Sequence, residues 1–305
     1  MWPNLMLIGS PKAGTSALSD LLIKYWGCSA RTNSKSHFIP VLSKEPCFFS
    51  IVNNTIYNSM RASDYKLLFH SCHKKKYFDA STQYLPFADA PKRSYEMIPE
   101  PYRTEIKILV ILREPISRDL SRYNNQVENV VRGKQRNLGG CFLSIVHAIQ
   151  PSIPTYSDVA DCEIKIWNKC TNISSCTSKL VIGMYSFHLR NWMRQWEKNS
   201  FKVINYNYLQ SSLQDIFNFV NLTSVKAQLI KLERVNENPY SNKVYLPECR
   251  ISNSLQKIYY PYNILLYKMF PQFPKFENIS CNTKDQIRMS AKFRYVKNIS
   301  NIEYL

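Results

Sequence analysis

The chain has 305 residues, with 40 Lys and Arg against 22 Asp and Glu, and its formal net charge is +18. Hydrophobic residues make up 45% of it, which is enough for a buried core and excludes a disordered basic tail. Only 7 glycines exclude a collagen-like class, and no run approaches the ~18 apolar residues needed to span a bilayer. The excess charge predicts a polyanionic partner, such as nucleic acid, an acidic glycan, a nucleotide or anionic lipid.

Strands and helices are predicted to alternate in the first third of the chain. The apolar run at 4–9 predicts a buried strand, and the spacing of leucines over 15–26 predicts a helix. A short strand is expected at 77–79, with helices near 62–70 and 89–98. The chain therefore opens as strand, tight loop and helix.

The strongest predicted strand is IKILVIL at 106–112, whose unbroken apolar run is typical of a parallel strand covered on both faces. Pro115 is expected to begin a helix that reaches about Glu128. Residues 151–180 are expected to be irregular. The remaining predictions are helices at 183–198, 209–220 and 252–270 and a strand at 201–206.

This alternation predicts an α/β fold in which helices flank a central parallel sheet. One domain is expected over 1–275, followed by a basic C-terminal tail of uncertain structure over 276–305. The sequence shows no internal repeat and no linker long enough to require a second domain.

The chain also contains nine cysteines and five N-x-[ST] sequons, which together favour the lumen of the secretory pathway. An odd cysteine count leaves at least one thiol free or paired between chains. Cys162, Cys170 and Cys176 predict a stapled surface loop, because the C-x2-C spacing of zinc sites is missing. The N-terminus does not resemble a signal peptide, so we expect either a cytoplasmic protein or a sequence that lacks an upstream anchor.

A predicted anion site follows the first strand, in Gly9-Ser10-Pro11-Lys12-Ala13-Gly14-Thr15-Ser16. Backbone N–H groups at a strand-to-helix junction point at an anion, and the helix dipole favours negative charge. The loop differs from the G-x4-G-K-[ST] loop of nucleotide triphosphatases, because its lysine is Lys12 and Thr15 follows Gly14. A surface turn is the alternative interpretation of such a short motif.

A second predicted anchor follows IKILVIL, in the run REPISRDLSRY. Arg113 lies at the carboxyl end of that strand, where open α/β sheets bind ligands, and Ser121 lies about two turns into the next helix. A guanidinium and a hydroxyl suit a terminal phosphate. The alternative is ordinary capping of a helix by charged residues.

The two motifs together resemble the cofactor motifs of sulfotransferases that use 3′-phosphoadenosine-5′-phosphosulfate (PAPS). The resemblance implies that Pro11, Lys12, Ala13, Gly14, Thr15 and Ser16 bind the 5′-phosphosulfate. It also implies that Arg113 and Ser121 bind the 3′-phosphate, and that PAPS is the co-substrate with no metal required.

Further segments resemble the Golgi carbohydrate branch of this family. KEPCFF at 44–49 is similar to the KEPHFF-type segment of heparan and chondroitin sulfotransferases, which implies that Glu45 is the catalytic base. Lys12 is the candidate catalytic cation, because its ammonium can follow the charge that develops on the bridging oxygen of the leaving group. DASTQY at 79–84 is weakly similar to their E-K-T-P-x-Y stretch, with Ala80 and Thr82 departing from it. Lys44, Ser81 and Tyr84 are therefore candidate substrate-binding residues.

The C-terminal half resembles the N-acetylgalactosamine 4-sulfate 6-O-sulfotransferase group, in WNKC at 167–170, GMYSFHLRNWMRQW at 183–196 and PECR at 247–250. The implied function is sulfuryl transfer from PAPS to a hydroxyl of a chondroitin- or dermatan-type glycosaminoglycan in the Golgi lumen. The expected partners are an acidic glycan or another hydroxylated acceptor, with no nucleic acid, and a membrane only through an anchor missing from this sequence.

Two alternatives remain at this point. One keeps PAPS but changes the acceptor to a small hydroxylated molecule or a protein tyrosine. The other is a non-catalytic basic glycan-binding protein with a degenerate nucleotide site. The acceptor hydroxyl, the disulfide pairing and the oligomeric state are left open by the sequence.

Overall fold

The computed structural model describes residues 1–30, 45–69, 74–133, 139–148, 153–233, 247–279 and 281. They form two compact units, each described here by itself. The sheet unit comprises Met1–Glu114, Tyr185–Asn236 and Tyr262–Phe276, and the helical unit comprises Pro115–Met184, Glu237–Pro261 and Glu277–Leu305.

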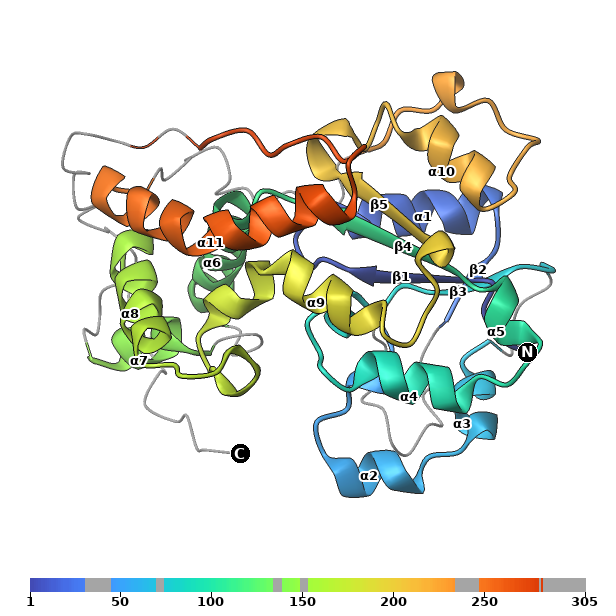
Figure 1. Cartoon of the computed structure of the whole chain (residues 1–305), viewed down its shortest axis with the longest axis horizontal. Coiled ribbons are helices and arrows are strands. Elements are labelled where there is room, and N and C mark those ends of the chain that lie inside the picture. The colour runs from blue at the N-terminus through green and yellow to red at the C-terminus, as the bar shows by residue number, and fades with distance from the viewer. Residues whose placement is uncertain are drawn as a thin grey trace. The chain divides into compact units, whose positions relative to one another are not determined.

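A five-stranded sheet with the order β2-β3-β1-β4-β5 lies at the centre of the sheet unit (Figure 1). Its strands are β1 (Leu5–Gly9), β2 (Cys28–Ser29), β3 (Tyr77–Asp79), β4 (Lys107–Leu112) and β5 (Phe201–Asn205). All neighbouring strands pair in parallel. The carboxyl ends of the strands therefore meet at one edge, as the sequence predicts for a parallel sheet.

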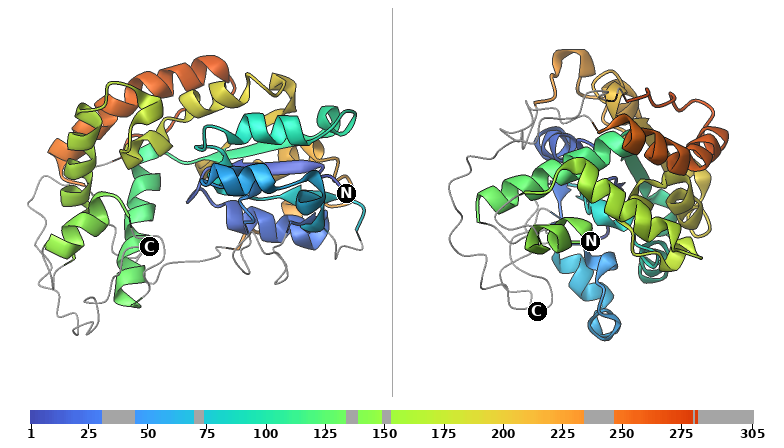
Figure 2. Two further views of the ribbon diagram at one scale, coloured as in Figure 1. Left: turned by 90° about the horizontal axis from the view of Figure 1, so that it is seen from below. Right: turned by 90° about the vertical axis from the view of Figure 1, so that its left-hand side faces the viewer.

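Both faces of this sheet are covered, which explains the unbroken apolar runs of its central strands. Leu5 and Leu7 of β1 pack on one face, while Met6 and Ile8 pack on the other. The first face is covered by α1 (Thr15–Tyr25) and α10 (Leu213–Phe219), and the second by α4 (Ala90–Met97) and α9 (Tyr185–Trp192) (Figures 1 and 2). The prediction of a sheet flanked by helices is confirmed.

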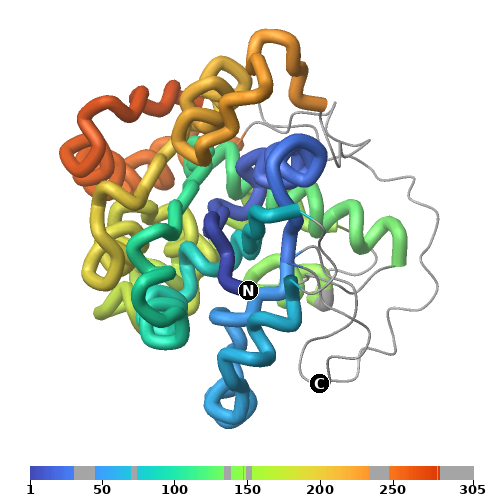
Figure 3. Tube along the Cα trace, turned by 90° about the vertical axis from the view of Figure 1, so that its right-hand side faces the viewer, coloured from blue at the N-terminus to red at the C-terminus, as the bar shows by residue number. Residues whose placement is uncertain are grey.

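Short helices complete the sheet unit. α2 (Asn54–Ser59) and α3 (Ala62–Leu67) lie on the same side of the sheet as α4, and their segment is the light-blue part of the tube in Figure 3. α5 (Tyr102–Glu105) precedes β4. Tyr65 of α3 is fully buried against Phe48 and Phe49, with ring centroids 5.0 and 4.7 Å away. Burying an aromatic ring of this size contributes about 1.5–3 kcal/mol, so this cluster fixes the segment that follows residue 44.

The helical unit contains α6 (Pro115–Val131), α7 (Cys141–Ala148), α8 (Tyr156–Asn168) and the first part of α11 (Cys249–Met269). Three disulfides lie in it: Cys141–Cys162 joins α7 to α8, Cys170–Cys176 closes a short loop, and Cys249–Cys281 ties the start of α11 to the chain beyond it. The predicted staple is confirmed for Cys170 and Cys176, whereas Cys162 instead lies within a helix.

The prediction that residues 151–180 are irregular is wrong, because α8 occupies residues 156–168. Thr155 and Asp158 form a capping box at its start: the Thr155 hydroxyl accepts from the Asp158 N–H, and the Asp158 carboxylate accepts from the Thr155 N–H. Because the first turn of α8 contains polar residues, a prediction based on apolar runs alone does not find this helix.

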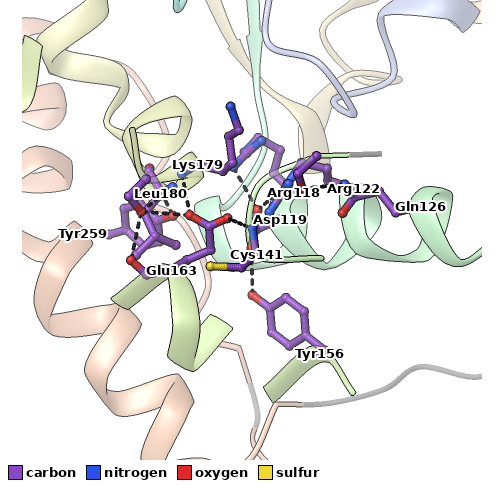
Figure 4. A network of polar contacts seen from close by, with 12 residues as sticks. Arg118, Asp119, Arg122, Gln126, Cys141, Tyr156, Glu163, Lys179, Leu180 and Tyr259 are labelled. Atoms are coloured by element: carbon purple, nitrogen blue, oxygen red, sulfur yellow. Dashed lines mark hydrogen bonds and ion pairs between the residues drawn. The ribbon is translucent and has the colours of Figure 1, made fainter. Parts of the chain in front are cut away.

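A buried ionic cluster packs α6 inside the helical unit (Figure 4). Asp119 is 1% exposed and accepts hydrogen bonds from Arg122 Nε at 2.9 Å, from Arg118 Nη2 at 3.4 Å and from the Tyr156 hydroxyl at 3.3 Å. Burial lowers the pKa of the Arg122 guanidinium, but the charge and hydrogen bond of Asp119 outweigh it and raise that pKa. The cluster therefore joins α6, the helix that carries Ser121, to α8.

Candidate active site

The loop that joins β1 to α1 has the backbone of an anion-binding turn. Lys12 and Gly14 are in the left-handed region, with φ of 69° and 79°. The Ser10 N–H donates to the carbonyl oxygen of Ile111 at 2.6 Å, so the loop is attached to β4. α1 begins at Thr15 directly after this turn, and the first N–H groups of a helix have no partner within the helix. The predicted strand, loop and helix are all present.

Tyr206, just beyond β5, packs between this loop and Arg113. A Cβ on Gly14 would lie only 2.9 Å from Cε2 of the Tyr206 ring. The Arg113 guanidinium carbon lies 5.0 Å from the centroid of the same ring, and Arg113 Nη1 donates to the Lys12 carbonyl at 3.3 Å. The strand-terminal arginine and the loop are therefore in direct contact.

One atom of the loop indicates that it fits an anion. The Ser10 side chain is fully buried, and its hydroxyl has no hydrogen-bond partner among the described residues. A buried hydroxyl without a partner costs about 1–3 kcal/mol, a cost that an anionic oxygen would remove. Lys12, the Ser10 hydroxyl and the start of α1 are a donor set suited to a phosphosulfate.

Ser121, the second residue of the predicted 3′-phosphate pair, lies half-buried on α6 in the helical unit. Arg113 lies half-buried in the sheet unit at the end of β4, and its carbonyl accepts a hydrogen bond from the Tyr185 hydroxyl at 2.7 Å. The joint role of Arg113 and Ser121 stays a prediction.

Glu45 is held at the same edge of the sheet as the loop. Its Oε2 accepts from the Thr82 N–H at 2.9 Å and from the Thr82 hydroxyl at 2.7 Å. A Cβ on Gly9 would lie 3.0 Å from the Thr82 carbonyl oxygen, and the Leu85 N–H donates to the Ile8 carbonyl at 2.9 Å. Thr82, which binds the Glu45 carboxylate, thus has its own carbonyl against the first residue of the phosphate loop.

Ser81 and Tyr84, which the sequence suggested as substrate-binding residues, lie in the interior with no exposed surface. Their hydroxyls donate to Asp79 at 2.6 and 2.8 Å. Burial raises the pKa of the Asp79 carboxyl, against the opposing effect of these hydrogen bonds. Unlike the Ser10 hydroxyl, both hydroxyls already have partners within the protein, so these residues would act on the acceptor through neighbouring groups.

The other candidates take varied positions. Pro11 and Ser16 are half-buried in the loop, Ala13 and Thr15 are buried, and Lys44 lies outside the described residues. Lys74, one of a basic run, donates to the carbonyl oxygens of Ile23 and Lys24 at the end of α1. That lysine caps a helix, a position favoured by the helix dipole.

The roles of Thr82 and Tyr206 could not be deduced from sequence motifs. Each follows the carboxyl end of a strand, β3 and β5 respectively, and that position is the signal that could have identified them. Within the described ranges, no cluster of three or more His, Cys, Asp or Glu side chains is placed to hold a metal ion. No helix there is both long and apolar enough to cross a bilayer.

Comparisons with known proteins agree with this geometry. A sequence model of the sulfotransferase domain family matches residues 3–258, and so spans both units as one domain. The solved structure of a sulfotransferase from Alicyclobacillus acidocaldarius is similar, with a TM-score of 0.55 and 17% identity over 89% of this chain and 96% of that one. A search of curated protein sequences gave no significant match. The chain belongs to the sulfotransferase domain family, and it is a PAPS-dependent sulfotransferase.

Proposed function

We propose that the chain transfers the sulfuryl group of PAPS to a carbohydrate hydroxyl, with a chondroitin- or dermatan-type glycosaminoglycan as the acceptor. The observation that carries this proposal is the pair of hydrogen bonds from Thr82 to the Glu45 carboxylate, because the Thr82 carbonyl lies against Gly9 at the start of the phosphate loop. The net charge of +18 supports an acidic acceptor, because two phosphate contacts use only a few of those charges.

Each residue has a distinct task in this proposal. PAPS supplies the activated sulfuryl group. Lys12 neutralises the negative charge that develops on the leaving phosphate, and the start of α1 adds the N–H groups and dipole that favour it. Glu45 accepts the proton of the acceptor hydroxyl as that oxygen attacks, so it must lie within about 3 Å of the hydroxyl. Most of the rate enhancement comes from positioning and charge stabilisation, as in phosphoryl transfer.

The remaining site residues bind the two substrates. Arg113 and Ser121 hold the 3′-phosphate, with Tyr206 fixing the plane of the Arg113 guanidinium. Lys44 contacts the acceptor, while Ser81 and Tyr84 act from the interior by holding the segment that contains Glu45. The three disulfides and the exposed sequon asparagines support a Golgi location, because disulfides persist in oxidising compartments.

Transfer of ³⁵S from labelled PAPS to desulfated chondroitin, dermatan and heparan sulfate tests the acceptor class. We expect label on chondroitin or dermatan. Label on heparan sulfate alone, on tyrosine peptides or on small phenols would contradict the proposed acceptor.

The Glu45→Gln variant tests the base. We expect a loss of kcat of about 100-fold or more, with the affinity for 3′-phosphoadenosine 5′-phosphate unchanged in calorimetry. Glu96→Gln is the control, because Glu96 is a surface carboxylate paired with Lys92 on α4. Full activity in Glu45→Gln would remove Glu45 as the base, and failure of the unmodified protein to bind the nucleotide would favour a degenerate site.

A further inference from the structure

The Asp79 carboxylate at the end of β3 is fully buried and surrounded by donors. Its Oδ1 accepts from the Ser81 N–H at 3.0 Å and from the Ser81 hydroxyl at 2.6 Å. Its Oδ2 accepts from the hydroxyls of Tyr84 at 2.8 Å and Tyr65 at 3.1 Å. An ionised carboxylate offers about four acceptor sites, and these four donors fill them.

The direction of two of these hydroxyls matters for the neighbouring segment. The Ser81 and Tyr84 hydroxyls each have one proton, and both protons point at Asp79. Their oxygens are therefore left to accept hydrogen bonds. Ser81 Oγ accepts from the Cys47 N–H at 3.0 Å, and the Tyr84 oxygen accepts from the Phe49 N–H at 3.4 Å. Asp79 thus fixes the backbone of residues 47–49 through two relays.

That backbone has an unfavourable conformation which needs support. Cys47 has a φ of 53°, in the left-handed region that residues with a side chain rarely adopt. Its carbonyl accepts from the N–H and hydroxyl of Ser50, and its N–H has the bond to Ser81. Glu45 lies two residues before it and is bound by Thr82, so residues 79–84 hold the segment at both ends.

We propose that Asp79 is a positioning residue that fixes the segment carrying the Glu45 carboxylate by orienting the hydroxyls of Ser81 and Tyr84. This inference rests on the proposed function, in which Glu45 is the base. In Asp79→Asn the side chain carries an NH2 group, which donates where Asp79 accepts. The hydroxyl that faces this NH2 group must then accept from it, so its own proton points at the backbone N–H of residue 47 or 49 and the hydrogen bond from that N–H is lost.

Tyr84→Phe and Tyr65→Phe form a matched pair that separates positioning from packing. Both tyrosines are fully buried and both donate to Asp79 Oδ2, but only Tyr84 is part of a relay to residues 47–49. We expect faster amide hydrogen exchange at Phe49 in Tyr84→Phe, and at Cys47 or Phe49, according to which relay reverses, in Asp79→Asn. Tyr65→Phe should leave both amides protected. This measurement needs no acceptor.

Kinetics with ³⁵S-labelled PAPS and chondroitin give the second readout. We expect Tyr84→Phe and Ser81→Ala to lower kcat by about 10- to 100-fold, with KM for PAPS unchanged, because a displaced group loses about that factor. Ser81→Thr, which keeps a hydroxyl, should recover most of the rate. Tyr65→Phe should lower the melting temperature about as much as Tyr84→Phe does, but it should retain nearly the full rate.

Equal exchange and equal rates in Tyr84→Phe and Tyr65→Phe would overturn the proposal and leave Asp79 a packing residue. Unchanged rates in both Tyr84→Phe and Ser81→Ala would also overturn it if Glu45→Gln is inactive. An active Glu45→Gln protein instead identifies a failure of the proposed base. Altered exchange at Cys47 or Phe49 would then still show that Asp79 fixes the segment.

Discussion

At the scale of single residues, Gly14 shows how closely the phosphate loop is packed. Its φ is 79°, and an added Cβ would lie 2.9 Å from the Tyr206 ring. We expect Gly14→Ala to lower stability by about 1–2 kcal/mol and to weaken binding of 3′-phosphoadenosine 5′-phosphate, because Tyr206 must move away from Arg113. Thermal unfolding and calorimetry measure the two effects.

Gly133→Ala is the control for that prediction. Gly133 has a similar φ of 66°, but a Cβ there would meet no atom within 4 Å. It should lose a similar amount of stability and no nucleotide affinity. Equal affinities in the two variants would show that Tyr206 does not support the loop.

The buried Asp79 also makes a prediction about pH. Its folded pKa is raised by burial above the value of about 3.9 expected in the unfolded chain, so the folded state binds the proton more tightly. The contribution of Asp79 to stability is therefore largest below about pH 4 and falls as pH rises through the folded pKa. In urea unfolding, the stability of the unmodified protein relative to Asp79→Asn should decline from pH 4 to 7. A constant difference would contradict the raised pKa.

Sequence motifs predict Lys12, Gly14 and Arg113 because each of them closely follows an apolar strand, and the two strands, β1 and β4, pair in parallel. They do not identify the partners of Glu45, because Thr82 is 37 residues away in the chain and meets it only after β3 and β1 have paired. The burial of Ser81 and Tyr84 also depends on packing between segments that are distant in the chain. The sequence alone therefore cannot distinguish a buried supporting side chain from one that binds the substrate.

At the scale of elements, α6 depends on one carboxylate. Asp119 is 1% exposed and contacts two guanidiniums, so Asp119→Asn leaves buried positive charge without compensation. We expect a loss of about 3–5 kcal/mol, measured by urea unfolding. Asp161→Asn is the control: that side chain is 27% exposed and pairs with Lys165 and Arg250, so its loss should cost less than about 1 kcal/mol. Similar losses in both variants would show that burial of Asp119 has no special effect.

The elements that the sequence predicts best are those with burial on both faces. β1 and β4 agree with their predicted ranges to within one residue, because every position in them except Lys107 is apolar or small. α8 was missed, since its buried face includes Ser157 and Glu163, which bind backbone or side-chain groups of the helical unit. A polar residue buried with its partner cannot be distinguished from an exposed one by periodicity.

At the scale of the whole molecule, the disulfides stabilise the helical unit. Cys141 and Cys162 are 21 residues apart, and closing a loop of that size contributes about 3 kcal/mol through the unfolded chain. The double variant Cys141→Ala, Cys162→Ala should lose about that much in denaturant unfolding. The Cys170–Cys176 disulfide closes a loop of only 6 residues, so the double variant Cys170→Ala, Cys176→Ala should lose less stability. A reversed order would contradict the loop-length explanation.

The exposed sequons provide a test of the proposed secretory location. Asn53, Asn172, Asn221 and Asn278 are all exposed. Expression through the secretory pathway should add N-glycans, seen as a mass decrease after peptide N-glycosidase treatment. Ser174→Ala removes the sequon of Asn172 without changing that asparagine, and should remove one glycan. An unchanged mass after enzyme treatment of the secreted protein would contradict the proposed location.

At this scale the net charge predicts only the sign of the partner's charge. The +18 charge is equally compatible with several polyanions, and it is the family match that distinguishes an enzyme from a basic binding protein. The acceptor is harder to predict, because side chains that would bind it need not be close together in the chain. No periodic pattern relates such residues to one another.

Cys47, the free thiol among the described cysteines, has a consequence for oxidative folding. Burial, with a smaller effect from Glu45, raises its pKa to about 12. At pH 7 only about one such thiol in 10⁵ is ionised, compared with a few per cent for an ordinary cysteine, and the thiolate is the form that attacks a disulfide. Once the sheet unit has folded, Cys47 is therefore a very slow reagent for disulfide exchange. An odd cysteine can persist in an oxidising compartment without scrambling the three native disulfides of the helical unit.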